Sequence, residues 1–136
     1  MSSLPNRLAR ILVLLGAIVV FATAVFHGTG YRPLTDALTG TELDEFFKRG
    51  LPALWLMFSF QLVALALAGT WVALRSPPGA RAVLALSAAL LAIDVLLLAI
   101  YVGLFSGTLV LALGAVATLA GTILWPGGGL SPDVDA

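Results

Sequence analysis

The residue with the most unusual setting in this sequence is Asp94, the single charged residue in the apolar run LLAIDVLLLAI at positions 90–100. A carboxylate is costly to dehydrate, so in an apolar helix it either accepts hydrogen bonds from a neighbouring side chain or exchanges protons or cations. Three further polar residues belong to the same candidate site by their position along the apolar runs, namely Gln61, Tyr101 and His27. Such a set either holds helices together or forms part of a proton path.

Cofactor chemistry is poorly supported by the residue types present. The chain contains no cysteine, which excludes disulfides, thiolate metal sites and thiol redox chemistry. One histidine, His27, cannot by itself form a zinc site or supply both axial ligands of a haem. The sequence PGGGL at 126–130 lacks the Lys of a phosphate-binding loop, and no nucleophile accompanies His27 and Asp94. We therefore expect no cofactor and no metal.

The composition indicates that the solvent of this chain is a lipid bilayer. Hydrophobic residues make up 60% of its 136 residues and charged residues 10%, far from the composition of a soluble domain. Lys plus Arg and Asp plus Glu number 7 each, so no basic excess attracts a polyanion. We expect the bilayer as partner and no nucleic acid.

Four apolar runs are long enough to cross a membrane, which takes about 20 residues of helix. They are bounded by charged residues, Pro or Gly, and occupy positions 8–26, 51–74, 82–105 and 108–125. Backbone groups in lipid must be paired within the segment, so these runs are predicted to be helices. The predicted fold is an all-α integral membrane four-helix bundle, formed by a single membrane domain over residues 1–136, with a cytoplasmic tail at 126–136.

The first run also admits a second interpretation. Arg7 and Arg10, the apolar stretch and the small residues ATA at 22–24 are typical of a secretory signal peptide with its cleavage site. Apolar residues continue past this point through Val25 and Phe26, and the run approaches spanning length. A retained helix is favoured over a cleaved one.

Basic residues near the ends of the runs predict the orientation. Four lie on one side and three on the other, and the first helix usually dominates. We therefore expect a cell (inner) membrane protein, multi-pass, with cytoplasmic N- and C-termini. The aromatic residues near the run ends are expected to sit at the two membrane interfaces. The basic residues are Arg7, Arg10, Arg75 and Arg81 against Arg32, Lys48 and Arg49; the aromatic ones are Trp71 and Trp125 against Tyr31, Trp55 and Tyr101.

The extracytoplasmic segment at 27–50 contains the pattern of a short helix. In TGTELDEFFKRG, Thr41 is a candidate N-cap, acidic residues fill the first turn, and Lys48 and Arg49 precede Gly50. We expect this helix, over Thr41–Arg49, to lie along the membrane surface with Phe46 and Phe47 inward. A docking or gating element is the alternative.

Counting along the chain predicts a partner for Asp94. It lies 12 positions after Ala82 and 11 before Phe105, so we expect it near the bilayer midplane. Gln61 lies 17 positions before Pro78 and Asp94 lies 16 after it, which places the two at one depth if these helices are antiparallel neighbours. A Gln amide can donate to a carboxylate or accept from a protonated acid.

Two stripes of polar or small residues at helical spacing extend the candidate site beyond Gln61 and Asp94. Ser87, Asp94 and Tyr101 recur every seven residues, and Gly16, Thr23 and His27 approximate a stripe on the first helix. A line from His27 past Tyr101 to Asp94 would resemble half of a proton path. Small residues on the second and fourth helices predict close helix packing; they are Ala64, Ala68, Gly114, Thr118 and Gly121.

The layout of the chain resembles one group of known proteins. An Arg-flanked first helix that ends in His27 and Gly28, an amphipathic segment, and a second helix that begins LPALWLMFSF are similar to the small four-helix bacterial inner-membrane proteins grouped as DoxX-like. The length is also similar to that of small multidrug-resistance transporters, but their essential Glu in the first helix has no counterpart here.

Three functions follow, in order of preference. The first is a structural or accessory membrane protein that binds partners through its helix faces and the segment at 27–50, the partners being other copies of itself or other membrane proteins. The second is an oligomeric proton-linked small transporter or channel that uses Asp94. The third is a membrane enzyme, which we expect least because no nucleophile, metal set or cofactor motif accompanies His27 and Asp94.

Overall fold

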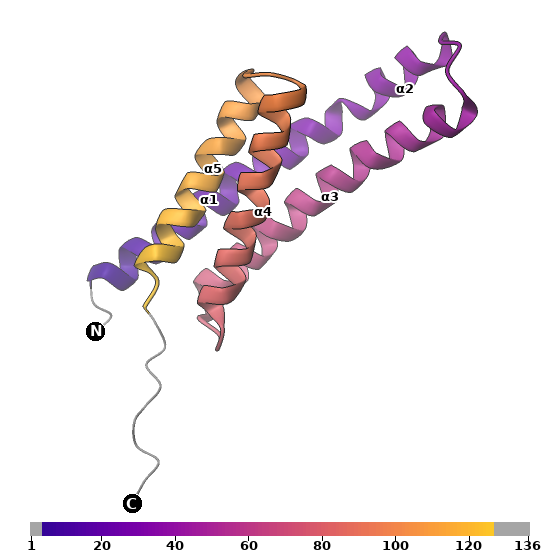
Figure 1. Cartoon of the computed structure of the whole chain (residues 1–136). Coiled ribbons are helices and arrows are strands. Elements are labelled where there is room, and N and C mark those ends of the chain that lie inside the picture. Colours follow the sequence, from indigo (N-terminus) through magenta and orange to yellow (C-terminus); the bar gives the residue numbers. More distant parts are fainter. Residues whose placement is uncertain (1–3, 127–136) are drawn as a thin grey trace, which may run out of the picture.

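The computed structural model describes residues 4–126, so all but the first residue of the predicted tail at 126–136 lies outside the described residues. This part of the chain consists of five helices and no strand: α1 Leu4–Thr29, α2 Tyr31–Thr39, α3 Glu45–Arg75, α4 Ala80–Tyr101 and α5 Ser106–Leu124 (Figure 1). With α1 and α2 taken together as Asn6–Thr39, four of these helices are long and apolar enough to cross a membrane. The predicted all-α membrane bundle is confirmed.

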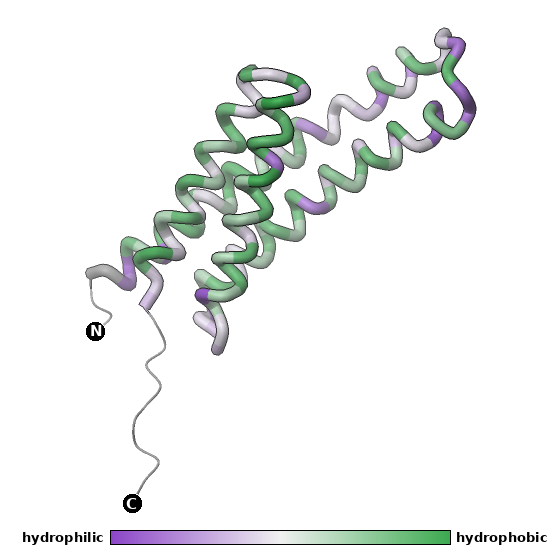
Figure 2. The backbone as a smooth tube through the Cα atoms, in the orientation of Figure 1, coloured by the Kyte–Doolittle hydropathy of each residue, from purple (hydrophilic) through white to green (hydrophobic). Residues whose placement is uncertain are grey.

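The helices differ in length, and this shapes the molecule. α3 has 31 residues and α4 has 22, which correspond to about 46 Å and about 33 Å of helix. α2 and the first turns of α3 therefore extend as a hairpin past the loop between α4 and α5 (Figure 1). Figure 2 shows that hydrophilic residues gather at the end of this hairpin, while the α4–α5 hairpin is mostly hydrophobic.

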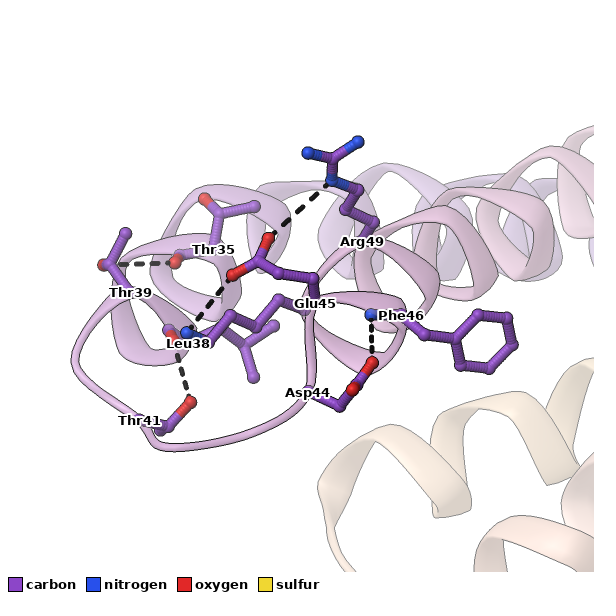
Figure 3. Close-up of polar contacts among 9 residues, drawn as sticks. Thr35, Leu38, Thr39, Thr41, Asp44, Glu45, Phe46 and Arg49 are labelled. Atoms are coloured by element: carbon purple, nitrogen blue, oxygen red, sulfur yellow. Dashed lines mark hydrogen bonds and ion pairs between the residues drawn. The ribbon is translucent and has the colours of Figure 1, made fainter.

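The short helix after α1 is present, but its predicted position at Thr41–Arg49 is wrong. Thr41 does not cap a helix, because its hydroxyl donates to the Leu38 carbonyl (2.8 Å) and so closes α2 instead. Asp44 is the N-cap, and its carboxylate accepts from the Phe46 amide (2.8 Å), so Glu45–Arg49 form the first turns of α3 (Figure 3). The Phe46 side chain is 76% exposed.

α1 is the central helix and packs along both α5 and α3. Small residues make this possible. A Cβ added at Gly16 would lie 2.6 Å from Thr118 Oγ1, and one added at Gly121 would lie 2.6 Å from Val13 Cγ2. Gly114 is likewise closed in by Val20. The predicted packing role of Gly114, Thr118 and Gly121 is therefore confirmed.

The small residues that α3 presents to α1 are not the predicted ones. Ala64 is exposed and Ala68 is half-buried, whereas Ala66 and Gly69 are buried. A Cβ on Gly69 would lie 3.6 Å from Ala17 Cβ of α1. The buried positions of α3 recur at helical spacing from Leu62 onward, so the α1-facing side passes through Ala66 and Gly69 and leaves Ala64 outside.

Two apolar clusters form the core, one toward each end of the bundle. The cluster near the start of α1 contains Ala9, Val13, Val72, Ala73, Ala80, Leu84 and Trp125; the other contains Val20, Ala24, Leu62, Ala66, Leu91, Leu111 and Ala115. Trp125 is only 6% exposed, so it is a core residue and not an interfacial belt residue. At the same end Arg10 Nη2 donates to Ser76 Oγ (2.8 Å), which joins the start of α1 to the α3–α4 turn.

Candidate functional site

The structure brings Gln61 and Asp94 together. The amide nitrogen Nε2 of Gln61 on α3 donates to Oδ2 of Asp94 on α4, over 2.9 Å. α3 and α4 are joined by a short turn at residues 76–79 and run antiparallel, which sets the two residues at one height. The predicted pairing is confirmed.

The position of this pair along α4 differs from the prediction. α4 ends at Tyr101 because Gly103 takes a positive φ of 100° and its amide donates to the Leu98 carbonyl (2.9 Å), which terminates the helix. Asp94 is 14 residues from Ala80 and 7 from Tyr101, or about 21 Å and about 10 Å. It therefore lies in the part of α4 closer to the α4–α5 loop and not at its middle.

The Gln61–Asp94 pair lies at the surface of the α3–α4 seam. Gln61 is exposed and Asp94 is half-buried. The side chains around the pair are apolar and also exposed, including Met57 one turn away on α3 and Leu97 one turn away on α4. The hydrogen bond joins two helices at the outside of the bundle and does not line an interior channel.

His27 belongs to a second polar cluster, inside the bundle. Its Nδ1 lies 2.9 Å from Ser59 Oγ of α3, and Ser59 Oγ donates to the Trp55 carbonyl (3.2 Å). Trp55 Nε1 in turn donates to the His27 carbonyl (2.8 Å), and the two rings are stacked with centroids 4.0 Å apart. The Phe58 ring meets His27 edge-on at 4.9 Å.

Gly30 makes room for this cluster. A Cβ at this position would lie 2.5 Å from Cζ2 of Trp55, so the indole ring can cross the α1–α2 junction only where there is no side chain. Sequence reasoning missed Trp55, Phe58 and Ser59. The available signal was the polar Ser59 within LPALWLMFSF, four residues after Trp55 and therefore on the same helix face.

The predicted polar line from His27 through Tyr101 to Asp94 is not present. Tyr101 is 81% exposed and makes no hydrogen bond with His27 or Asp94. The apolar residues Phe58 and Leu98 flank His27, and the next turn of α4 from Leu98 leads to Asp94. Of the four predicted site residues, the structure thus pairs Gln61 with Asp94, gives His27 other partners and leaves Tyr101 outside.

Within residues 4–126 no three His, Asp or Glu side chains are grouped so that they could hold a metal ion. Comparison of the chain with protein-family models, with curated proteins and with solved structures finds no match. The chemistry available at the Gln61–Asp94 pair is hydrogen bonding and proton exchange. The chemistry available at the His27 cluster is hydrogen bonding to the imidazole.

Proposed function

We propose that this chain is a structural or accessory protein of the inner membrane that binds a membrane partner through the α3–α4 face, and that the partner is a second copy of the chain. The observation that carries this proposal is the exposed hydrogen bond between Gln61 and Asp94. The face is defined by Met57, Gln61 and Ala64 of α3 and by Asp94 and Leu97 of α4.

The pair leaves hydrogen-bonding capacity unused. Asp94 Oδ1 accepts no hydrogen bond from any residue in the described part of the chain, and the Gln61 amide keeps one N–H and its carbonyl oxygen. Lipid tails cannot satisfy these groups, and polar groups exposed to hydrocarbon are costly. A protein surface that covers the face removes this cost.

A second copy is chemically suited to cover it. In a two-fold dimer the same face meets itself, so each Gln61 can donate one N–H to its own Asp94 and the other to Asp94 of the opposite copy. Each carboxylate then accepts on both oxygens. This arrangement needs no further residue type, and it satisfies both N–H groups of each Gln61 and both oxygens of each Asp94.

The surroundings of the pair favour close approach. Ala64 is one turn from Gln61 on α3 and is exposed although it is small. Small exposed residues in membrane helices allow two backbones to come close enough for side chains such as Gln61 to reach across. Ala64, which lies outside the α1-facing side of α3, is therefore placed to contact the second copy at the α3–α4 face.

We also infer that both ends of the described chain face the cytoplasm. The Arg10–Ser76 hydrogen bond places the first helix and the α3–α4 turn at one end, and Figure 1 places the start of α1 near the end of α5. Arg7, Arg10, Arg75 and Arg81 then share this end, in accord with the positive-inside rule.

The test is self-association in liposomes. Donor- and acceptor-labelled chains should show energy transfer that falls on dilution with lipid. Asp94→Leu should weaken association at least about sevenfold, because it removes two intermolecular hydrogen bonds of about 0.6 kcal/mol each and makes the monomer face more apolar. Leu113→Ala, on the exposed face of α5, should leave it unchanged. Equal association of wild type and Asp94→Leu contradicts the proposal.

The alternative is an oligomeric proton-linked transporter. The same face supports it only in the assembled state, because two Asp94 carboxylates would then lie near each other and could share protons. Asp94→Asn separates the two functions, as described in the Discussion.

A further inference from the structure

A cavity of about 320 Å³ opens beside His27, between α1, α3, α4 and the start of α5. Its walls are mainly apolar side chains, among them Phe26, Trp55, Phe58, Leu98, Val102 and Phe105. The volume lies at the lower end of the range of small-molecule sites, and apolar walls favour an apolar occupant over water. The cavity is separate from the α3–α4 face.

The hydroxyl groups that line the cavity have already used their protons. Thr23 Oγ1 donates to the Val19 carbonyl (2.8 Å), and Thr29 Oγ1 donates to the Phe26 carbonyl (2.6 Å). The indole Nε1–H of Trp55 is also occupied, by the His27 carbonyl. The hydroxyl oxygens keep acceptor lone pairs, whereas the side-chain donors are all engaged.

The hydrogen bonds around Ser59 bear on which ring nitrogen of His27 carries the proton. Ser59 Oγ lies 3.2 Å from the Trp55 carbonyl and 2.9 Å from His27 Nδ1, and with its one proton assigned to the carbonyl of the preceding turn it accepts from His27. In this assignment Nδ1 of His27 carries the proton. In the neutral imidazole the other nitrogen, Nε2, is then an acceptor.

This acceptor is available to a ligand. Nε2 of His27 has no hydrogen-bond partner in the described part of the chain, yet it is not among the enclosed, unpartnered polar atoms, so it is reachable from outside. His27 lines the cavity together with Trp55 and Phe58, whose aromatic rings hold the imidazole in place. The site thus combines apolar walls with the imidazole of His27 as its polar group.

We propose that this cavity binds a neutral, lipid-soluble molecule that carries one hydroxyl group, an alcohol or a phenol, and that the hydroxyl donates to His27 Nε2. A cationic ligand would find no carboxylate among the lining residues. A ligand whose polar group is a carbonyl or an ether would find no free side-chain donor. This assignment does not depend on self-association.

The experiment compares two probes that differ by the donor alone, 1-naphthol and 1-methoxynaphthalene. Radiolabelled probes are equilibrated with the full chain in nanodiscs, with empty nanodiscs as background. We expect saturable 1-naphthol binding about five- to tenfold tighter than that of the ether, the contribution of one hydrogen bond. Equal affinities, or no saturable binding of either probe, overturn the proposal.

Variants locate the site. His27→Phe keeps an aromatic ring against Trp55 but removes the acceptor, so 1-naphthol should fall to the affinity of the ether. Val102→Trp narrows the cavity at an exposed lining position and should weaken both probes alike. Asp94→Asn, outside the cavity, should change neither. A naphthol preference that persists in His27→Phe overturns the assignment, and the wild-type comparison decides the matter if that variant does not fold.

Discussion

Two polar residues of α3, Ser59 and Gln61, are only two positions apart, about 3 Å along the helix axis, yet they belong to different environments. Two positions correspond to about 200° around a helix, so they face nearly opposite sides. Ser59 is buried and contacts His27. Gln61 is exposed and contacts Asp94.

The inner pair, His27 and Ser59, differs from the outer pair, Gln61 and Asp94, in the hydrogen-bond donors that remain unused. Around His27 and Ser59 each side-chain donor finds an acceptor within the described residues, the Trp55 and Phe58 rings contact the imidazole, and the unused group is the acceptor Nε2. At Gln61 and Asp94 one hydrogen bond forms and the remaining donor and acceptors face outward. The inner pair therefore stabilises the fold of one chain, whereas the outer pair is suited to an assembly.

The largest effect on folding should come from Ser59→Ala. It leaves the Nδ1–H of His27 without an acceptor, so we expect the free energy of unfolding to fall by about 1–3 kcal/mol. The measurement is reversible unfolding in micelles. Ser87→Ala is the matched control, because that buried hydroxyl donates only to the Val83 carbonyl of its own helix, and its loss should cost less. Equal losses would refute the special role of the inner pair.

A smaller effect on the free energy of unfolding is expected when the Gln61–Asp94 pair is replaced in the monomer. The double variant Gln61→Leu with Asp94→Leu loses one interhelical hydrogen bond, a kind that averages about 0.6 kcal/mol in membranes, and gains apolar surface. Unfolding in micelles at protein dilutions that hold the chain monomeric should change by less than about 1 kcal/mol. A loss as large as that of Ser59→Ala would mean that the outer pair is part of the fold.

The smallest effect should follow Asp94→Asn. The amide oxygen of Asn still accepts from Gln61, so the free energy of unfolding should stay within about 0.6 kcal/mol of wild type and energy transfer between chains should persist. Proton flux into liposomes that contain the chain should be the same before and after the change. Flux in the wild type that Asp94→Asn abolishes would support the transporter instead.

The sequence allowed the outer pair to be predicted and not the inner one, for a geometric reason. Gln61 and Asp94 flank a short turn, so counting from Pro78 gives their relative height without knowledge of helix packing. His27 and Ser59 lie on helices connected by α2 and a turn, where residue counting fixes no register. Their contact depends on the α1–α3 packing that Gly69 and Ala17 allow.

Helix ends were predicted less well than helix existence. Thr41 and Asp44 are both good N-cap residues, and the choice between them was decided by the Leu38 carbonyl, which engages the Thr41 hydroxyl. α4 ends at Tyr101 because Gly103 adopts a positive φ, although apolar residues continue to Phe105. Hydropathy alone predicts neither which residue caps α3 nor where α4 ends.

The most direct measurement of the central claim is cysteine cross-linking at the α3–α4 face in native-like membranes. The chain has no cysteine, so a single Ala64→Cys reports on this face alone. Oxidation with copper phenanthroline should give a disulfide-linked dimer, since a two-fold contact through Gln61 brings the two Ala64 positions close together. Leu113→Cys, at a position of α5 that is also exposed, should remain monomeric. A dimer from Leu113→Cys and none from Ala64→Cys would contradict the assignment of the Gln61–Asp94 face to self-association.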